Sequence, residues 1–323
     1  MKAIVYSRYG PPEVLQLKDV EKPTPKPDQV LIRIQATSVT AADYRMRAFR
    51  VPSKLFWLPT RLIMGVFKPR YSILGADFSG EIEAVGQQVT RYREGDRVFG
   101  CSPSFGTYAE YTCLPENGSF VLKPDAIPDE SAAAVSFGML TALYFLRDTA
   151  KVISGQKVLV YGASGAVGTA SVQFAKVLGA EVTAVCSESN MELMKSLGAD
   201  RVIDYAAENF ASIGETWNVI FDTVGKTTFA RCKDSLTSEG IYMTTVFGAR
   251  ELRQMLWTSI VGGRKVKCGV VGNAREDVLY IRDLVESGQV KVVIDRRYPL
   301  EQIVEAHRYA DQGHKKGNIV IAV

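Results

Sequence analysis

The sequence of 323 residues has few cysteines, and those it has are scattered. They are odd in number, and no two of them form a C-x-x-C pair. Such a set predicts neither a disulfide framework nor a thiol redox motif, so we expect reduced thiols in a cytoplasmic protein. The cysteines are Cys101, Cys113, Cys186, Cys232 and Cys268.

Long apolar runs and a strong charge of one sign are also missing. No run approaches the roughly 20 residues of a membrane span. Met1 and Lys2 lead straight into the strand-like AIVYS, so we expect no signal peptide. The formal net charge of +4 is small for this length, whereas nucleic-acid binding needs a concentrated basic face. We therefore expect neither a transmembrane segment nor a nucleic-acid partner.

The first 122 residues alternate apolar and polar residues in the way of β-strands. The pattern is clear in QVLIRIQATSV (29–39), GEIEAVG (80–86) and DRVFG (96–100), and it predicts an antiparallel β domain. Segment 44–76 differs, because it combines seven basic residues with large apolar ones and has no acid. It predicts a surface helix packing its apolar face on the domain. Our working hypothesis is a lid over an apolar substrate pocket, and contact with an anionic membrane surface is a less favoured alternative.

After Asp129 the pattern changes to a buried helix over 131–150, followed by strands that alternate with helices. Near-continuous apolar strands between helices predict a parallel sheet covered on both faces. The tail returns to a strand, a helix and a last strand. The expected strands are 157–162, 181–186, 201–205, 218–224, 240–246, 265–271, 290–300 and 318–323, and the expected helices 166–179, 190–198 and 301–311.

The stretch VYGASGAVG (160–168) joins the first of these strands to a helix and carries regularly spaced glycines. Gly162 permits a tight turn, Gly165 lets the backbone approach a pyrophosphate, and Gly168 lets helix and strand pack closely. The helix N-terminus then presents N–H groups and a partial positive charge to the diphosphate. In this strand–loop–helix context the motif predicts a dinucleotide cofactor.

The stretch TAVCSESN (183–190) bears on which dinucleotide is bound. An NAD-binding acid is expected about 20 residues after the last glycine, which leads to Ser187 or Glu188. Because Cys186 ends the apolar strand, Ser187 fills that place most naturally. A serine leaves room for a 2′-phosphate, whereas Glu188 would oppose one if it pointed inward. The residues favour NADPH and leave NADH open.

Taken as a set, these stretches resemble the medium-chain dehydrogenase/reductase superfamily, in its zinc-free quinone-oxidoreductase branch. The likeness extends along essentially the whole chain. It implies a GroES-like β domain from residues 1–122 and about 290–323, with a Rossmann domain over about 123–289, and a homodimer. The matching stretches are MKAIVYSRYGPPEVL, LGADFSGEIEAVGQQVTRYREGDRVFG (74–100), VYGASGAVG, CSESNMELMKSLGADRVIDY (186–205) and GHKKGNIVIAV.

The same resemblance implies that zinc is absent. The zinc alcohol dehydrogenases of the superfamily hold the metal with a cysteine, the histidine of G-H-E and a later cysteine or histidine. The corresponding places here are Thr40, Ala76 and about Phe137, none of which binds zinc. The chain has only two histidines, His307 and His314.

The resemblance also implies site residues. Thr40, Asp43 and Tyr44 fall in the family's catalytic region. Tyr44 is either a proton donor or a packing residue, and Asp43 is catalytic or a structural hydrogen-bonding partner. Lys316 reaches the phosphates or is a solvated charge. The implied cofactor contacts are Ser164, Ala166 and Val167 in the glycine loop, Ser187, Asn190 and Tyr205 at the adenosine end, Phe247 and Val270 near the nicotinamide, and Lys316.

Without a Lewis acid, oxidation of a simple alcohol is difficult, whereas hydride transfer to an electron-poor acceptor is easier. The expected function is therefore NADPH-dependent reduction of quinones or α,β-unsaturated carbonyls of small apolar type. The alternatives are a cofactor-binding protein with little turnover and an alcohol dehydrogenase-like activity.

Overall fold

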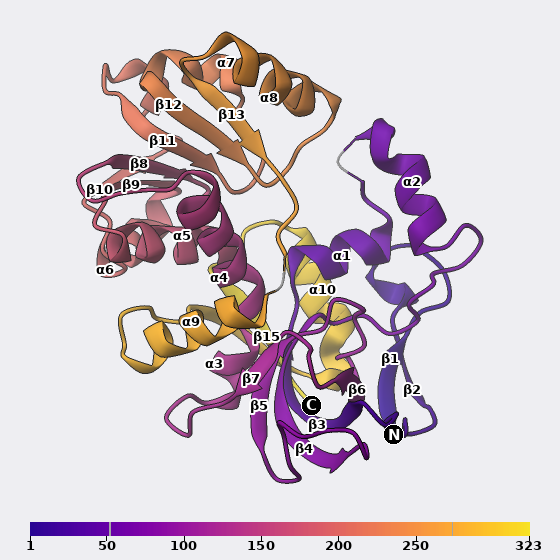
Figure 1. Ribbon diagram of the computed structural model, residues 1–323. Helices are drawn as coiled ribbons and strands as arrows, with labels where there is room; N and C mark the ends of the chain where they lie inside the picture. The colour runs from indigo at the N-terminus through magenta and orange to yellow at the C-terminus, as the bar shows by residue number, and fades with distance from the viewer. Residues whose placement is uncertain (52, 273) are drawn as a thin grey trace.

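The structure is a computed structural model that describes residues 1–51, 53–272 and 274–323. Six strands form a parallel sheet, whose order along the sheet is β10-β9-β8-β11-β12-β13 (Figure 1). Numbered by their appearance in the chain, this is the order 3-2-1-4-5-6 of dinucleotide-binding sheets. The strands are β8 (Lys157–Tyr161), β9 (Glu181–Cys186), β10 (Arg201–Asp204), β11 (Trp217–Asp222), β12 (Leu236–Thr244) and β13 (Lys265–Cys268).

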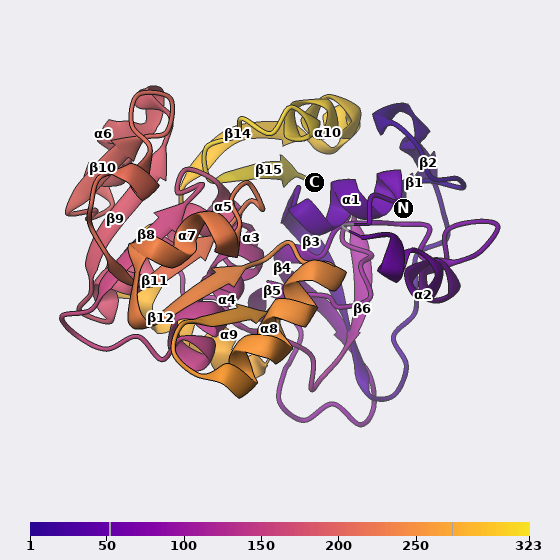
Figure 2. The ribbon, with the colours of Figure 1, turned by 90° about the horizontal axis from the view of Figure 1, so that it is seen from above.

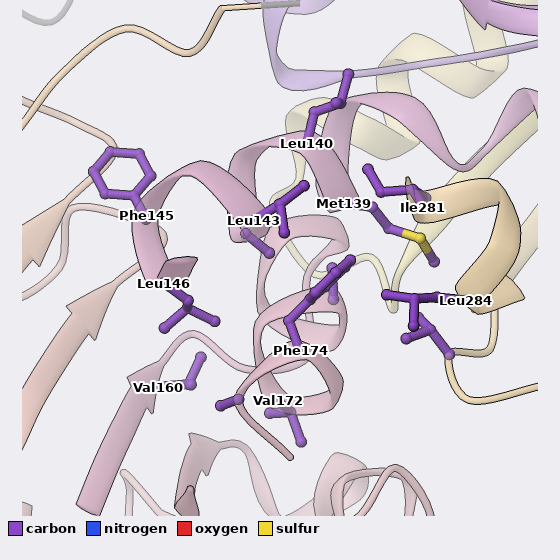
Figure 3. Close-up of a cluster of buried hydrophobic side chains, with 14 of the residues drawn as sticks. Met139, Leu140, Leu143, Phe145, Leu146, Val160, Val172, Phe174, Ile281 and Leu284 are labelled. Atoms are coloured by element: carbon purple, nitrogen blue, oxygen red, sulfur yellow. The ribbon is translucent and has the colours of Figure 1, made fainter. Parts of the chain in front are cut away.

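Helices cover both faces of this sheet, because neighbouring strand residues point to opposite sides. Val160 of β8 joins a core with residues of α4, α5 and α9, as Figure 3 shows, while Leu159 joins a second core with Cys232 and Met255 of α7 and α8. This explains why the sequence of β8 is apolar without interruption. The helices are α4 (Ser136–Leu143), α5 (Ala166–Val177), α6 (Met191–Ser196), α7 (Phe229–Cys232), α8 (Ala249–Val261) and α9 (Arg275–Glu286).

A second sheet combines both ends of the chain. Its order is β14-β15-β3-β4-β5-β7, with β6 also paired to β3, and every pair except β14 with β15 is antiparallel. The C-terminal elements therefore lie beside the N-terminal ones in both views (Figures 1 and 2). The strands are β3 (Gln29–Ser38), β4 (Asp77–Val85), β5 (Arg97–Cys101), β6 (Tyr111–Pro115), β7 (Phe120–Leu122), β14 (Ile294–Pro299) and β15 (Asn318–Ala322).

Smaller elements complete the fold. A hairpin of β1 (Lys2–Val5) and β2 (Gln16–Asp19) lies beside α1 (Ala41–Ala48), and α10 (Ile303–Asp311) packs against α1. The antiparallel and parallel sheets confirm the predicted combination of an antiparallel β domain with a doubly wound one. The predicted limits between the domains stay a prediction. Of the described helices, none has both the length and the apolar character needed to cross a membrane.

The ends of several elements differ from the predicted ones. The expected helix over 131–150 is α3 (Asp129–Ala133) and α4, followed by a π-helical turn over 144–149. The neighbours Phe145 and Leu146 of this turn are both buried. The strand expected over 265–271 already ends at Cys268.

Segment 44–76 forms the end of α1 and then α2 (Lys54–Met64), but α2 does not bury its apolar face as predicted. Leu58, Leu62 and Ile63 are more than half exposed. The attachment is aromatic instead, because the Trp57 ring meets Phe49 edge-on at 5.9 Å between centroids. The prediction failed because these aromatic contacts, and not the aliphatic face, hold the helix in place.

Candidate functional site

A cavity of about 1180 Å³ is lined by residues of both sheets. On the parallel-sheet side its residues lie at or just beyond the carboxyl ends of strands, around the point between β8 and β11 where the strand order reverses. Ligands of doubly wound sheets bind at this place. Every predicted cofactor residue lines the cavity, namely Gly162, Ser164, Gly165, Ala166, Val167, Gly168, Ser187, Asn190, Tyr205, Phe247, Val270 and Lys316.

The glycine loop has the geometry that a diphosphate site needs. Gly162 adopts φ +79°, a conformation that favours glycine. A Cβ on Gly168 would lie 2.3 Å from the Gly162 carbonyl oxygen, so only glycine lets α5 pack on the turn. A Cβ on Gly165 would meet nothing closer than 3.8 Å. No side chain caps α5, so its first N–H groups are free for an anion.

The loop is held in place by the C-terminal segment. The Gly317 N–H donates to the Ser164 carbonyl oxygen at 2.7 Å, and Gly317 also forms a parallel bridge with Gly165. This contact brings Lys316 to the adenosine end of the cavity, where its Nζ lies 3.5 Å from the Ser189 carbonyl oxygen. The basic residue that is missing from the β9 turn is thus provided from more than a hundred residues away.

The turn after β9 forms a polar part of the cavity wall. The Asn190 Nδ2 donates to Ser187 Oγ at 2.9 Å, and the Asn190 Oδ1 is buried without a hydrogen-bonding partner among the described residues. Such an unpaired group is typical of a site that a ligand completes. Glu188 is exposed and does not line the cavity, so it does not oppose a phosphate there.

At the opposite end, the structure separates the three predicted catalytic residues. Tyr44 lines the cavity, but Thr40 and Asp43 do not. Both are buried in the N-terminal cap of α1, where Asp43 Oδ2 accepts from Thr40 N and Oγ1 at 2.8 and 2.6 Å. Asp43 Oδ1 accepts from Gly75 N at 3.0 Å. Burial raises the pKa of Asp43 to about 6. This geometry favours the structural alternative for Asp43.

Two of the three positions that correspond to zinc ligands lie at the cavity, and they carry other residues. Ala76 and Phe137 line the cavity, and the Thr40 hydroxyl is engaged by Asp43. Within the described ranges, no three histidine, cysteine or acidic side chains gather as a metal site.

Several lining residues escaped the sequence prediction. Asp77 lies next to Ala76 in the GAD stretch, and burial raises its pKa to about 7. Arg45 follows Tyr44, is half-buried and makes no ion pair with a described residue. Lys226 and Lys315 add positive charge on the cofactor side. Asp77, Arg45 and Lys315 are each next to a residue that the sequence singled out, and this adjacency could have identified them. For Lys226 the sequence offered only its position after β11.

Comparison with known proteins agrees with this geometry. Residues 26–125 match the family model of the alcohol dehydrogenase GroES-like domain, and residues 197–321 match that of a zinc-binding dehydrogenase. The chain is 33% identical to 2-methylene-furan-3-one reductase of Solanum lycopersicum, over 99% of this chain and 79% of that protein. It is 32% identical to the chloroplastic NADPH-dependent alkenal/one oxidoreductase of Arabidopsis thaliana, with the same coverage.

A solved structure shows the same fold over the full length. The quinone oxidoreductase from Coxiella burnetii has a TM-score of 0.89 and 29% identity, covering 100% of this chain and 99% of that one. The GroES-like and Rossmann parts predicted from the sequence are thereby confirmed. The chain belongs to the medium-chain dehydrogenase/reductase superfamily, in its zinc-free quinone-oxidoreductase branch.

Proposed function

We propose that the protein is an NADPH-dependent reductase of quinones or α,β-unsaturated carbonyl compounds with small apolar bodies. The observation that carries this proposal is one continuous cavity with two different ends. One end has a glycine loop and a helix N-terminus that no described side chain caps, and the other has apolar side chains and no cluster of three potential metal ligands among the described residues. The printed names of relatives, an alkenal/one oxidoreductase and a furanone reductase, support the same class of acceptor.

The residues present fit the cofactor. The free N–H groups of α5 would hold the diphosphate, Ser187 and Asn190 the adenosine ribose with its phosphate, and Phe247 and Val270 the nicotinamide end. When bound there, NADPH supplies the hydride. The protein's own task is to hold the acceptor against the nicotinamide and to keep water out.

The acceptor end suits an apolar molecule with one polar atom. Phe105, Phe137 and Leu140 supply apolar surface. Tyr44 and Arg45 also line the cavity, and we infer that the Tyr44 hydroxyl and the Arg45 guanidinium interact with a carbonyl oxygen that gains negative charge. Preorganised donors of this kind stabilise charge that develops in the transition state. Thr40 and Asp43 act indirectly, because they fix the start of the helix that carries both groups.

The preference for NADPH over NADH rests on the residues around Ser187. The exposed ammonium of Lys316 is available to a 2′-phosphate, whereas the unpaired Asn190 Oδ1 is an acceptor and suits a ribose hydroxyl. No acidic side chain from the described part of the chain lines this end. The preference should be moderate, because the ammonium of Lys316 is exposed and salt screens its charge.

The deciding experiment is steady-state kinetics of the purified protein with NADPH and NADH across quinones, enals and enones, and with NADP+ and NAD+ on simple alcohols. We expect the protein to oxidise NADPH with quinones or enones and not to oxidise the simple alcohols. Binding of NADPH without turnover on any acceptor would instead support the alternative of a cofactor-binding protein. Alcohol oxidation would point to an alcohol dehydrogenase-like enzyme.

The homodimer is part of the same proposal. Strand β13 lies at the edge of the parallel sheet and pairs with β12 on one side only. An unpaired edge strand is a ready place for another strand, so two copies could join their sheets there. Light scattering should give about twice the mass of one chain, and a charged or proline substitution in β13 should shift it to that of the monomer.

A further inference from the structure

One carboxyl group stands alone in the cavity. Among the described residues that line it, Asp77 is the only acid. Arg45 lies at the same end, and Lys226, Lys315 and Lys316 line the cofactor side. Asp77 is the first residue of β4 and is 2% exposed. A carboxyl group this deeply buried is rare unless it is paired or has a function.

The two oxygens of Asp77 have different surroundings. Oδ2 accepts hydrogen bonds from the Phe137 N–H at 3.1 Å and from the Ser38 hydroxyl at 3.2 Å. Oδ1 makes no hydrogen bond with a described residue, and it is not among the fully enclosed unpaired atoms, so it keeps contact with the cavity. One oxygen is therefore fixed by the protein, while the other is free for a ligand.

The position within the cavity matters as much as the hydrogen bonds. Asp77 lies between Ala76 and Phe137, where zinc-dependent relatives place metal ligands and this chain has none. We propose that Asp77 is the proton donor of the reduction, acting through Oδ1 on the acceptor at this end of the cavity. The proposal rests on the proposed function.

The proton balance of the step is complete. The β carbon of an enone accepts a hydride, its C=C electron pair moves toward the α carbon and carbonyl oxygen, and the Asp77 O–H bond breaks to protonate that position. For a quinone the proton goes to a ring oxygen. The Asp77 carboxylate then takes a proton from water that enters through the cavity. NADPH is the only reductant needed.

The surroundings hold a large share of this carboxyl in its protonated form near neutral pH. Burial raises the pKa of Asp77 to about 7, and the nearby Asp43 carboxylate adds to the effect, while the Phe137 N–H and the Ser38 hydroxyl oppose it. The other titratable groups nearby are Cys101, which pairs with Asp77 across β4 and β5, and Tyr108. Burial holds the pKa of both well above the ordinary range, so they stay neutral.

The first test compares the wild type with Asp77→Asn. Asparagine has the size of aspartate, and its amide oxygen can still accept the hydrogen bonds from the Phe137 N–H and the Ser38 hydroxyl. We expect kcat to fall on the order of 100-fold, a typical effect of removing a general acid, with little change in KM. The wild-type kcat should decrease as pH rises above about 7, and the kcat of Asp77→Asn should not show this decrease. The matched control is Asp125→Asn, whose side chain is 97% exposed.

A second variant shifts the proton donor without removing it. Ser38→Ala deletes one hydrogen bond to Oδ2, which stabilises the charged form, so the pKa of Asp77 should rise. The pH at which kcat begins to fall should therefore be higher in Ser38→Ala than in the wild type. A purely structural role of Asp77 predicts no such movement. If Asp77→Asn does not fold, the pH profile of Ser38→Ala still tests the role of Asp77.

A third readout needs no turnover. The pKa of Asp77 is raised in the folded protein. The protonated carboxyl therefore stabilises the folded state to its full extent below the pKa of Asp in the unfolded chain, about 4. This contribution to stability is lost as pH rises through about 7. Asp77→Asn should therefore gain stability relative to the wild type between pH 4 and about 8 in urea unfolding. A stability difference independent of pH would overturn the proposal.

The outcomes separate this proposal from the proposed function. If the wild type reduces no quinone or enone, the proposed function fails. If the wild type is active while Asp77→Asn keeps its kcat and its pH profile, only the role of Asp77 fails. A proton transfer that limits the rate makes the wild type slower in D2O than in H2O. Loss of this solvent isotope effect in Tyr44→Phe, and not in Asp77→Asn, would assign the proton to Tyr44 instead.

Discussion

Replacing Ser187 with aspartate would place a carboxylate at the end of β9, where an NAD-binding acid belongs. The structure offers room for it, because Ser187 lines the cavity and its Oγ already accepts a hydrogen bond from Asn190. The new carboxylate could accept the same bond and also bonds from ribose hydroxyls. We expect the variant to fold and to exchange its preference from NADPH to NADH.

The size of the change follows from charge. Lys316 Nζ lies 3.5 Å from the carbonyl oxygen of Ser189, in the same turn as Ser187, and we take a separation on the order of 5 Å between a phosphate held by this lysine and the new carboxylate. At that distance two unit charges repel by about 1 kcal/mol in water and about 3 kcal/mol near a protein surface. A hydrogen bond to the NADH ribose contributes about 1 kcal/mol in the other direction. Together these terms should lower the NADPH/NADH affinity ratio by about 100-fold.

The assay is titration of both cofactors by calorimetry at low and high salt, together with kcat/KM for each. The repulsion should weaken as salt rises. Ser187→Asn is the matched neutral control and should leave the ratio within about threefold. If Ser187→Asp folds and the ratio does not change, Ser187 does not face the ribose, and our assignment of the 2′-phosphate site is wrong.

Three further substitutions test other parts of the structure. Lys316→Gln should weaken NADPH binding about tenfold, by the loss of one charge-assisted hydrogen bond, and leave NADH binding unchanged in the same titration. Gly168→Ala should abolish measurable binding of either cofactor in a fluorescence titration, because its Cβ would lie 2.3 Å from the Gly162 carbonyl oxygen. Arg47→Leu should lower the free energy of unfolding by about 3 kcal/mol in urea, since it removes a fully buried guanidinium that donates to Asp311 at 2.6 Å.

The cofactor side of the site could be predicted from the sequence because local rules determine it. The spacing of Gly162, Gly165 and Gly168 fixes a backbone turn, and the strand before it fixes where that turn lies in the sheet. Ser187 followed from the same counting. All these residues line the cavity. Periodicity also located the strands of the parallel sheet, since burial on both faces leaves an uninterrupted apolar run.

The acceptor side was less predictable, because its chemistry depends on contacts between distant segments. Asp43 looks like a catalytic acid in the sequence, and only the cap formed with Thr40 and Gly75 shows that both its oxygens are already engaged. Asp77 is one acid among many until its burial against Phe137, sixty residues away, is known. The exposed apolar face of α2 was also missed, because periodicity shows a face but not whether anything covers it.

One strand pairing connects the two ends of the cavity. In the register of β15 with β3, Val320 lies opposite Ser38. Four residues before Val320, Lys316 reaches the turn after β9, while the Ser38 hydroxyl donates to Asp77 at the other end. A slip of this register by one residue would turn the side chains of β15 to the other face of the sheet and move Lys316 away from the adenosine end. The position of Lys316 therefore depends on the pairing of β15 with β3, and the hydrogen bond from Ser38 to Asp77 depends on the pairing of β3 with β4. Strand β3 takes part in both pairings, which is why the two ends of the cavity could not be related to each other by reading either chain end alone.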